Sequence, residues 1–363
     1  MHITLVAGTR PNFVKISPLI NEIIKRQKSG TNIAYRLVHT GQHYDKGMSA
    51  SFFQELNIPD PHSNLSVGSG SSAEQTSAIM VGFEKELLNH PTDIVIVVGD
   101  VNSTMACAIV TKKLNIKLAH IEGGIRSFDN SMPEEINRKI TDSITDYFFT
   151  TSEFANKNLL NEGVNKNKIH FVGNVMIDTL LNNYENFRKP DFFEKFKLTA
   201  KNYLVLTLHR PNNVDNIDKL LTILSAISSN SKKCPIIFPI HPRTENSLKN
   251  SNFDFPNLHF VPPMTYLEFN YIVKNSKAVL TDSGGITEEA TVMEVPCLTL
   301  RDNTERPETV EIGTNELIGT NPSNIKPYLD KVFCGNWKKG NIPDLWDGKS
   351  SERIVEKLLM LFS

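Results

Sequence analysis

Short apolar runs recur along the chain, and each is followed by a glycine or a polar residue and then by a helical pattern. In the first half of the chain these runs cover residues 3–7, 94–98, 117–121, 147–150 and 169–173. Runs of this length without polar alternation need cover on both faces, so they predict buried parallel strands with helices between them. We therefore expect a doubly wound α/β layer.

The same pattern returns in the second half, where strand candidates cover 203–208, 236–240, 258–261, 278–281 and 296–300. Between the two sets, the stretch 182–201 is polar and is expected to be a helix and linker. We predict two Rossmann-like domains, 1–175 and 176–350. An amphipathic helix over 351–363 is expected to pack back on the first of them.

Length, charge and cysteine usage narrow the class of protein. The 363 residues exceed twice the average domain of roughly 150. Lys and Arg number 39 against 40 Asp and Glu, so a nucleic-acid partner, which usually meets a basic excess, is not expected. Without an 18-residue apolar run or a signal-peptide pattern, we expect no membrane partner and a cytoplasmic location. The four cysteines form no CxxC, so neither disulfides nor zinc are expected.

Two glycine turns follow predicted strands and could bind an anion, because ligands of open α/β sheets bind at the carboxyl ends of strands. The turn GTRPNFVK (8–15) opens a helix, and Arg10 and Lys15 could add charge to its backbone N–H groups. It could equally be an ordinary strand–helix turn with solvated cations. It matches neither GxGxxG nor a Walker A loop.

The second turn, DSGGITEE (282–289), is the stronger candidate. Gly284 and Gly285 allow a phosphate to approach the backbone, and the helix start favours negative charge. Glu289 could compensate the helix dipole, but a role in accepting hydrogen bonds from sugar hydroxyls is favoured. Arg306, in the charged loop after the last strand, is expected to bind phosphate rather than only water.

Carboxylates and histidines at other strand ends are candidates for acid–base chemistry. Asp100 and Glu122 end neighbouring predicted strands, where carboxylates are seldom needed for stability. His209 and His241 end strands of the second half, and two such positions in one domain favour function over a structural role. The histidines form no HExxH spacing and no GxSxG occurs, so neither a metal nor serine hydrolase chemistry is expected.

A helix beginning near Pro133 carries Glu134 and Arg138, four residues apart on one face. By spacing alone, this is a surface ion pair worth about 0.3–0.5 kcal/mol, although in a cleft it could hold a charged ligand. The buried stripe of the helix is expected to be Ile136, Ile140 and Ile144.

Nine segments, taken together, are more specific than any single motif. In order they are GTRPNFVK (8–15), HTGQHYD (39–45), GDVNST (99–104), HIEGGIRS (120–127), MPEEINR (132–138), GNVMID (173–178), LTLHRPNN (206–213), TDSGGITEEA (281–290) and RDNTERPE (301–308). They are distributed along most of the chain, from residue 8 to residue 308. The chain resembles the non-hydrolysing UDP-N-acetylglucosamine 2-epimerases, which show these segments in the same order.

The resemblance implies a GT-B arrangement of the two domains, an active site in the cleft between them, a homodimer and no cofactor. It implies an isomerase that interconverts UDP-N-acetylglucosamine and UDP-N-acetylmannosamine for surface polysaccharide precursors. UDP leaves by anti elimination to give 2-acetamidoglucal and then adds back with the proton on the other face of C2. Loss of UDP first makes chemical sense, because the C2 proton has no ring carbonyl beside it.

The family's functional residues map onto this sequence motif by motif. The implied catalytic residues are Asp100, Glu122, Glu134 and His209, the last near the departing phosphate. The implied substrate-binding residues are Arg10, Lys15, Arg138, His241, Met264, Phe269, Ser283, Gly284, Gly285, Glu289 and Arg306. Among these, Met264 and Phe269 lie where the family contacts uracil, and Glu289 would bind ribose. Which carboxylate acts on which face of C2 stays open.

Two departures from the family pattern affect regulation and substrate. The stretch QHYD (42–45) and the later SVGSGS (66–71), which has no arginine, lack the residues that bind an activating second substrate molecule in many members. Regulation of that kind is not expected. The QHYD pattern also occurs in relatives that act on 2,3-diacetamido-glucuronate or 6-deoxy sugars, so the sugar stays open.

Other functions compete less well. Hydrolysing relatives usually open with a Gly-Ser-Arg-Ala-Glu turn, which residues 8–11 do not match. A GT-B glycosyltransferase would share the architecture but would not exchange the C2 hydrogen with solvent. A nucleotide-sugar sensor should lack the acid–base set that this sequence carries.

Overall fold

The computed structural model describes residues 1–41, 52–240, 248 and 255–362. The chain forms two compact units. Unit 1 contains Met1–Asn182 and Asp344–Ser363, and unit 2 contains Asn183–Pro343. These limits differ from the expected division, because residues 176–182 continue a helix of unit 1 and the segment after 343 also belongs to unit 1.

Unit 1 is built on a parallel sheet with the strand order β3-β2-β1-β4-β5-β6-β7. Its strands are β1 (His2–Ala7), β2 (Ala34–His39), β3 (Ser63–Asn64), β4 (Ile94–Val98), β5 (Lys117–Ile121), β6 (Tyr147–Thr150) and β7 (Ile169–Phe171). All five apolar runs form strands, and the most apolar, β4, is buried at every position. The pattern did not predict β2, whose first three residues are only half-buried, or the two-residue β3.

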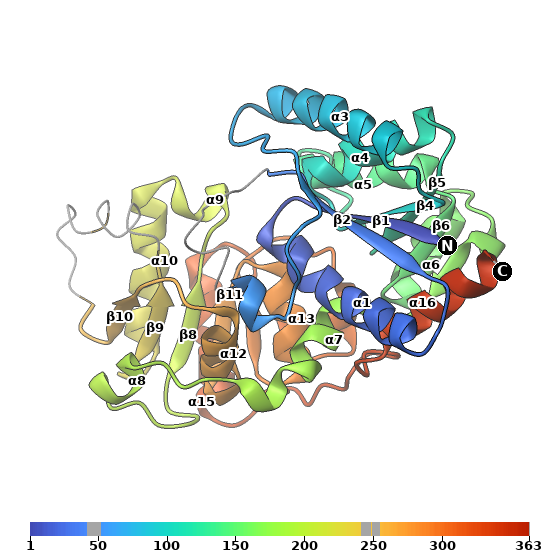
Figure 1. The fold of residues 1–363 in the computed structure, drawn as a ribbon. Coiled ribbons are helices and arrows are strands. Elements are labelled where there is room, and N and C mark those ends of the chain that lie inside the picture. Colours follow the sequence, from blue (N-terminus) through green and yellow to red (C-terminus); the bar gives the residue numbers. More distant parts are fainter. Residues whose placement is uncertain (42–51, 241–247, 249–254, 363) are drawn as a thin grey trace. The chain divides into compact units, whose positions relative to one another are not determined.

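Helices cover both faces of the unit 1 sheet. They are α1 (Arg10–Lys28), α3 (Ser72–Asn89), α4 (Asn102–Lys113), α5 (Pro133–Ile144), α6 (Glu153–Asn161), α7 (Val175–Asn182) and α16 (Ser350–Leu361). The helices α3, α4 and α5 pack in series on one face, and α1, α7 and α16 pack together on the other (Figure 1). This is the expected result of right-handed crossovers that leave β1 in opposite directions.

The carboxyl-terminal segment is fastened into unit 1 by buried polar contacts. Trp346 is 2% exposed and its Nε1 donates to the carbonyl oxygen of Thr151 at 2.9 Å. The carboxylate of Asp178 accepts from the backbone nitrogens of Ser350 and Ser351 at 3.0 and 2.6 Å. These contacts hold α16 against α1 and α7.

Unit 2 repeats the architecture with the strand order β10-β9-β8-β11-β12-β13, again all parallel. Its strands are β8 (Leu204–Thr207), β9 (Ile236–Pro239), β10 (Leu258–Val261), β11 (Ala278–Thr281), β12 (Cys297–Thr299) and β13 (Asn315–Leu317). Only the three-residue β13 was not predicted. Its helices are α8 (Phe192–Lys195), α9 (Pro211–Val214), α10 (Ile217–Asn230), α12 (Tyr266–Asn275), α13 (Gly284–Val292), α14 (Pro307–Glu311) and α15 (Ile325–Phe333).

Both sheets reverse direction once, and this reversal determines where a ligand can bind. In each unit the chain first winds to one side and then returns to continue on the other, which is the Rossmann order. The reversal lies between β1 and β4 in unit 1 and between β8 and β11 in unit 2. Ligands of such sheets bind at the carboxyl ends of the strands at this point.

Among the helices that the structure describes, none is long and apolar enough to cross a membrane.

Candidate active site

In each unit, predicted site residues lie at the carboxyl ends of the strands that flank the reversal. In unit 1, Arg10 follows β1 and Asp100 follows β4, while Glu122 follows the adjacent β5. In unit 2, His209 follows β8 and Asp282 follows β11. The candidate side chains therefore lie where an open α/β sheet can offer them to a ligand.

The turn between β1 and α1 is held by Asn12, which the sequence analysis did not single out. Its Oδ1 accepts from the backbone nitrogens of Gly8 and Thr9 at 3.2 and 3.1 Å, and its Nδ2 donates to the carbonyl oxygen of Val98 at 3.0 Å. One side chain thus ties the end of β1 to the end of β4. Arg10, just after the turn, is exposed and its guanidinium lies 4.7 Å from the ring centre of Phe52.

Lys15 and Glu122 form a buried ion pair. The Nζ of Lys15 lies 2.7 Å from Oε2 of Glu122, and their side chains are 9% and 3% exposed. Glu122 has φ +73°, a left-handed backbone conformation that is uncommon for a residue with a Cβ and that clusters at functional sites. A Cβ on Gly99 would lie 3.4 Å from this Nζ, so the residue before Asp100 directly borders the pair.

Asp100 is held from α5. Arg138 donates from Nη2 to Oδ2 of Asp100 and from Nη1 to Oε2 of Glu135, the latter at 2.9 Å. Glu135 is fully buried and also accepts from the backbone nitrogens of Ser127 and Phe128 at 2.9 and 3.1 Å. Burial alone would raise the pKa of Glu135, but the Ser127 amide and the Arg138 guanidinium bring it below its ordinary value.

The expected orientation of α5 is wrong. Ile136 is 49% exposed, and Ile140 and Ile144 are only half-buried. The buried face instead carries Glu135, Asn137, Arg138, Thr141 and Asp142. A charged face is buried here because its ion pairs and hydrogen bonds satisfy it, which hydrophobic periodicity does not take into account. Among the described residues, half-exposed Glu134 has no hydrogen bond or ion pair.

In unit 2, Asp282 orients His209. Asp282 is fully buried, and its Oδ1 lies 2.7 Å from Nδ1 of His209, whose side chain is 62% exposed. The same carboxylate accepts from the backbone nitrogen of Arg210 and from Nδ2 of Asn213 at 3.0 and 3.1 Å. Burial opposes the charge of Asp282, but the His209 ring and these donors lower its pKa overall. The arrangement leaves Nε2 of His209 for a ligand.

The Ser-Gly-Gly turn starts α13 beside buried cations. Ser283 lies at its N-cap and donates from its backbone nitrogen to Oγ1 of Thr281 at 3.0 Å, and Gly284 and Gly285 are half-buried. A Cβ on Gly284 would lie 2.9 Å from Oε1 of Glu305. Arg306 is 5% exposed and its Nε donates to Glu288. The helix start thus has no side-chain cap, and Arg306 contacts the same helix through Glu288.

Glu289 is buried inside α13 and is bound by a tyrosine. The hydroxyl of Tyr266, the first residue of α12, donates to Oε1 of Glu289 at 2.8 Å. Burial raises the pKa of Glu289 to about 7, because the Tyr266 bond only partly offsets the burial and Glu288 adds like charge. Met264 and Phe269, which flank this tyrosine in the chain, are half-buried. His241 and the stretch 42–45 lie outside the described residues.

The sequence profile of the UDP-N-acetylglucosamine 2-epimerase family matches residues 25–359. The chain belongs to this family. It is an isomerase, and its two Rossmann-type sheets form a GT-B fold.

The family relatives cover the chain from end to end. A UDP-N-acetylglucosamine 2-epimerase of Methanocaldococcus jannaschii is 44% identical over 370 residues, 99% of each chain. A crystal structure of that organism's UDP-GlcNAc 2-epimerase, in complex with UDP-GlcNAc and UDP, matches with a TM-score of 0.88 and 43% identity over 99% of this chain and 100% of that one. A UDP-2,3-diacetamido-2,3-dideoxy-D-glucuronate 2-epimerase of Pseudomonas aeruginosa is 37% identical over 99% of this chain and 100% of its own.

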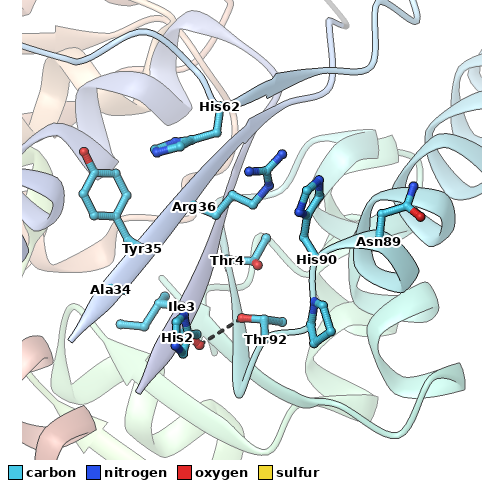
Figure 2. Close-up of a pocket in the computed structure, with 11 residues that line it drawn as sticks. His2, Ile3, Thr4, Ala34, Tyr35, Arg36, His62, Asn89, His90 and Thr92 are labelled. Carbon is cyan, nitrogen blue, oxygen red and sulfur yellow. Dashed lines mark hydrogen bonds between the residues drawn. The ribbon is translucent and has the colours of Figure 1, made fainter. Parts of the chain in front are cut away.

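In this epimerase fold a separate hollow lies at the opposite edge of the unit 1 sheet (Figure 2). Its volume is about 330 Å³, and its lining includes His2, Tyr35, Arg36, His62 and His90. These residues lie on the amino-terminal parts of β1 and β2, just before β3 and just after α3, whereas the candidate site lies at the carboxyl ends of the strands. Within the described ranges no three His, Cys, Asp or Glu side chains could hold a metal ion.

Proposed function

We propose that the protein is a non-hydrolysing 2-epimerase that interconverts UDP-N-acetylglucosamine and UDP-N-acetylmannosamine. In the proposed reaction, the C1–O bond to UDP breaks and the C2 proton passes to a protein base, which leaves 2-acetamidoglucal. UDP then adds back at C1 while a proton reaches the opposite face of C2. The atoms balance without a cofactor, because UDP and one proton leave and return.

The observation that supports this most is that each strand-end carboxylate of unit 1 is paired with a cation. Glu122 is paired with Lys15 and Asp100 with Arg138. Carboxylates fixed in this way can move the C2 proton and can stabilise positive charge at C1 as UDP leaves. Glu134, one turn before Arg138 on α5, is the third candidate for this chemistry.

Unit 2 is the proposed nucleotide half of the site. Nε2 of His209 would face the departing phosphate while Asp282 holds the ring through Nδ1 on the other side. The residues proposed to hold UDP are His241, Met264, Phe269, Ser283, Gly284, Gly285, Glu289 and Arg306, with Arg10 and Lys15 from unit 1. Because Lys15 is paired with Glu122, its proposed role includes orienting that carboxylate as well as meeting phosphate.

A second sugar remains a specific candidate. The relative from Pseudomonas aeruginosa that carries a 2,3-diacetamido-glucuronate name covers the whole length of the fold. The proton transfer at C2 would be the same on that substrate. We therefore treat the sugar beyond C2 as the part of the proposal to be decided by direct comparison of the two nucleotides.

The deciding experiment is proton NMR with UDP-N-acetylglucosamine in deuterated water. The expected result is UDP-N-acetylmannosamine with deuterium at C2 in both sugars. Release of UDP with free N-acetylmannosamine would instead indicate a hydrolysing enzyme. Exchange only with the diacetamido-uronate nucleotide would identify that nucleotide as the substrate. No exchange with either nucleotide would overturn the proposal.

Substitution of Glu122 tests its part in the chemistry. We expect Glu122→Gln to slow C2 exchange by at least ~10²-fold, since a positioned acid or base supplies about that much. The matched control is His90→Gln, an exposed residue in the hollow at the other edge of the sheet, which should exchange at the wild-type rate. Equal rates for Glu122→Gln and the control would remove Glu122 from the mechanism.

The homodimer is also a proposal. Val81 and Leu88, seven residues apart on one face of α3, are 56% and 65% exposed and are proposed to lie in the interface. A dimer mass by light scattering, lost in a Val81→Glu variant, is the expected result. A monomeric wild type would contradict it. The cytoplasmic location and the link to polysaccharide precursors stay predictions of the sequence.

A further inference from the structure

A buried charged network lies beneath the candidate carboxylates of unit 1, and the proposed reaction assigns it no role. Its centre is His120, which lies on β5 two residues before Glu122 and is 0% exposed. Its principal partner is Asp142, on the buried face of α5 and 4% exposed. Both residues come from segments that also carry candidate catalytic side chains.

Each ring nitrogen of His120 faces an oxygen at hydrogen-bond distance. Nδ1 lies 2.7 Å from Oδ1 of Asp142, and Nε2 lies 2.9 Å from the carbonyl oxygen of Gly99. Both distances are too short for a ring carbon in place of the nitrogen, so the ring orientation is settled by its partners.

Neither of these partners has a proton to give. A backbone carbonyl only accepts, so Nε2 must carry a hydrogen. Oδ2 of Asp142 also accepts from the Gly124 amide at 3.0 Å and lies 2.7 Å from Nη1 of Arg126. The amide and the buried guanidinium both stabilise the charged form of Asp142, independently of the state of His120. Asp142 is therefore a carboxylate, and Nδ1 of His120 must carry a hydrogen as well.

The network connects the two strand ends that carry Asp100 and Glu122. Gly99, immediately before Asp100, is fixed to β5 twice: its nitrogen donates to Ile121 at 3.2 Å and its carbonyl accepts from His120. Asp142 in turn holds Gly124, two residues after Glu122. One histidine–aspartate pair thus sets the backbone on both sides of the reaction.

We propose that His120 is a buried imidazolium that, together with Asp142, acts as a positioning pair for Asp100 and Glu122. The pair contacts no substrate and moves no proton. It fixes the spacing of the two carboxylates through the Gly99 carbonyl and the Gly124 amide. The kinetic part of this inference rests on the proposed epimerase function, whereas the protonation state does not.

The first test is side-chain nitrogen NMR on protein labelled with ¹⁵N-histidine, in neutral buffer. The His120→Gln variant identifies the His120 signals among those of the 10 histidines. We expect both His120 nitrogens to be protonated in the wild type. In Asp142→Asn, an amide N–H can donate to Nδ1, so only Nε2 should stay protonated. A neutral ring in the wild type, or a doubly protonated ring in Asp142→Asn, would overturn the assignment.

The second test separates positioning from folding. We expect His120→Gln to lower kcat for C2 exchange by roughly 10²-fold with little change in KM, since displacement of reacting groups by about 1 Å costs that much. Asp142→Asn keeps the Nε2–Gly99 bond and should lose less. If His120→Gln does not fold, the kcat of Asp142→Asn alone tests the positioning role. His90→Gln again serves as the unaffected control.

Wild-type kcat in both variants would overturn the positioning role, as would a raised KM with unchanged kcat. If the wild type itself exchanges no C2 hydrogen, the proposed function fails. The NMR result would then still decide whether the buried imidazolium exists.

Discussion

At the scale of single residues, two buried carboxylates of unit 2 have pKa values that are shifted in opposite directions. Asp282 is surrounded by donors, and its pKa is lowered despite complete burial. Glu289 has Tyr266 as a donor but lies beside Glu288, and its pKa is raised to about 7. Their different neighbours therefore keep one buried carboxylate charged and place the other near its midpoint at neutral pH.

The raised pKa of Glu289 predicts a pH-dependent cost to stability. Its ordinary value is 4.5, so between about 4.5 and 7 the folded state holds a proton that the unfolded state releases. Wild-type stability should fall as pH rises through this window. Glu289→Gln should be more stable than the wild type by up to about 3 kcal/mol at pH 8 and nearly equal at pH 4.5. Urea unfolding from pH 4.5 to 8 measures this difference in stability, with exposed Glu311→Gln as the control. A difference that does not depend on pH would contradict the prediction.

Asp282 should matter for activity through His209. In Asp282→Asn the amide keeps its shape but loses the charge that faces Nδ1 of the ring. We expect kcat for C2 exchange to fall by roughly 10²-fold, because the ring loses its orientation and its preferred tautomer. Asp330→Asn, on α15, is the matched control, because the Asp330 side chain is 43% exposed. Similar rates for both variants would show that His209 does not depend on this partner.

The sequence singled out the candidate residues of the site but not the side chains that contact them. Asp100, Glu122 and His209 were found because they end apolar strands. Tyr266 was not found, because it contacts Glu289, 23 residues later in the chain, only through the packing of two helices. The contacts of buried Glu135 with Arg138 and with the backbone at 127–128 were also missed. The helix pattern does not distinguish Glu135 from its neighbour Glu134.

At the scale of elements, the connection from β5 to α5 is a tightly constrained part of unit 1. It contains Glu122 with φ +73° and Gly124 with φ +82°, so the chain turns twice through left-handed conformations. A Cβ on Gly124 would lie 2.4 Å from the carbonyl oxygen of Ala155. The turn fits tightly against α6 because this position has no side chain.

Two glycines of unit 1 test this constraint. Gly30 has a similar φ of +88°, but a Cβ there would meet nothing within 4 Å. Gly30→Ala should therefore cost only the conformational strain of about 1–2 kcal/mol. Gly124→Ala adds a clash with backbone and should cost about 3–5 kcal/mol. Unfolding free energies measure both, and equal losses would mean that the loop relaxes freely.

Strands that are apolar on both faces could be predicted from the sequence. Elements with mixed polar and apolar faces could not. The buried strand β4 is apolar throughout and was predicted with its observed limits. In β2, Arg36 pairs with Glu86 on α3 and breaks the apolar run. For α5 the error was one of orientation, because its buried face is held by ion pairs instead of packing.

At the scale of the whole molecule, unit 2 is inserted between two segments of unit 1. Each unit contains one of the two tryptophans. Trp346 is nearly fully buried in unit 1, whereas half-buried Trp337 packs on the core of unit 2 and donates to the Thr314 carbonyl at 2.8 Å. These two side chains allow each unit to be perturbed and observed separately.

We expect Trp346→Ala to destabilise unit 1 by about 3–5 kcal/mol, the usual loss for a buried aromatic. Hydrogen exchange should then rise in peptides of β6, β7 and α7, and stay unchanged in the strands of unit 2. Trp337→Ala should show the reverse pattern. Uniform loss of protection in both variants would mean that the units unfold as one.

The inserted order also bears on how the protein is synthesised. On the ribosome, residues 183–343 emerge in full before Trp346 and α16, so unit 2 can fold while unit 1 still lacks its last helix. Until that point the surface of α1 and α7 that α16 covers stays open. A premature stop near the end of the message would therefore leave unit 2 complete and damage the unit whose synthesis began first.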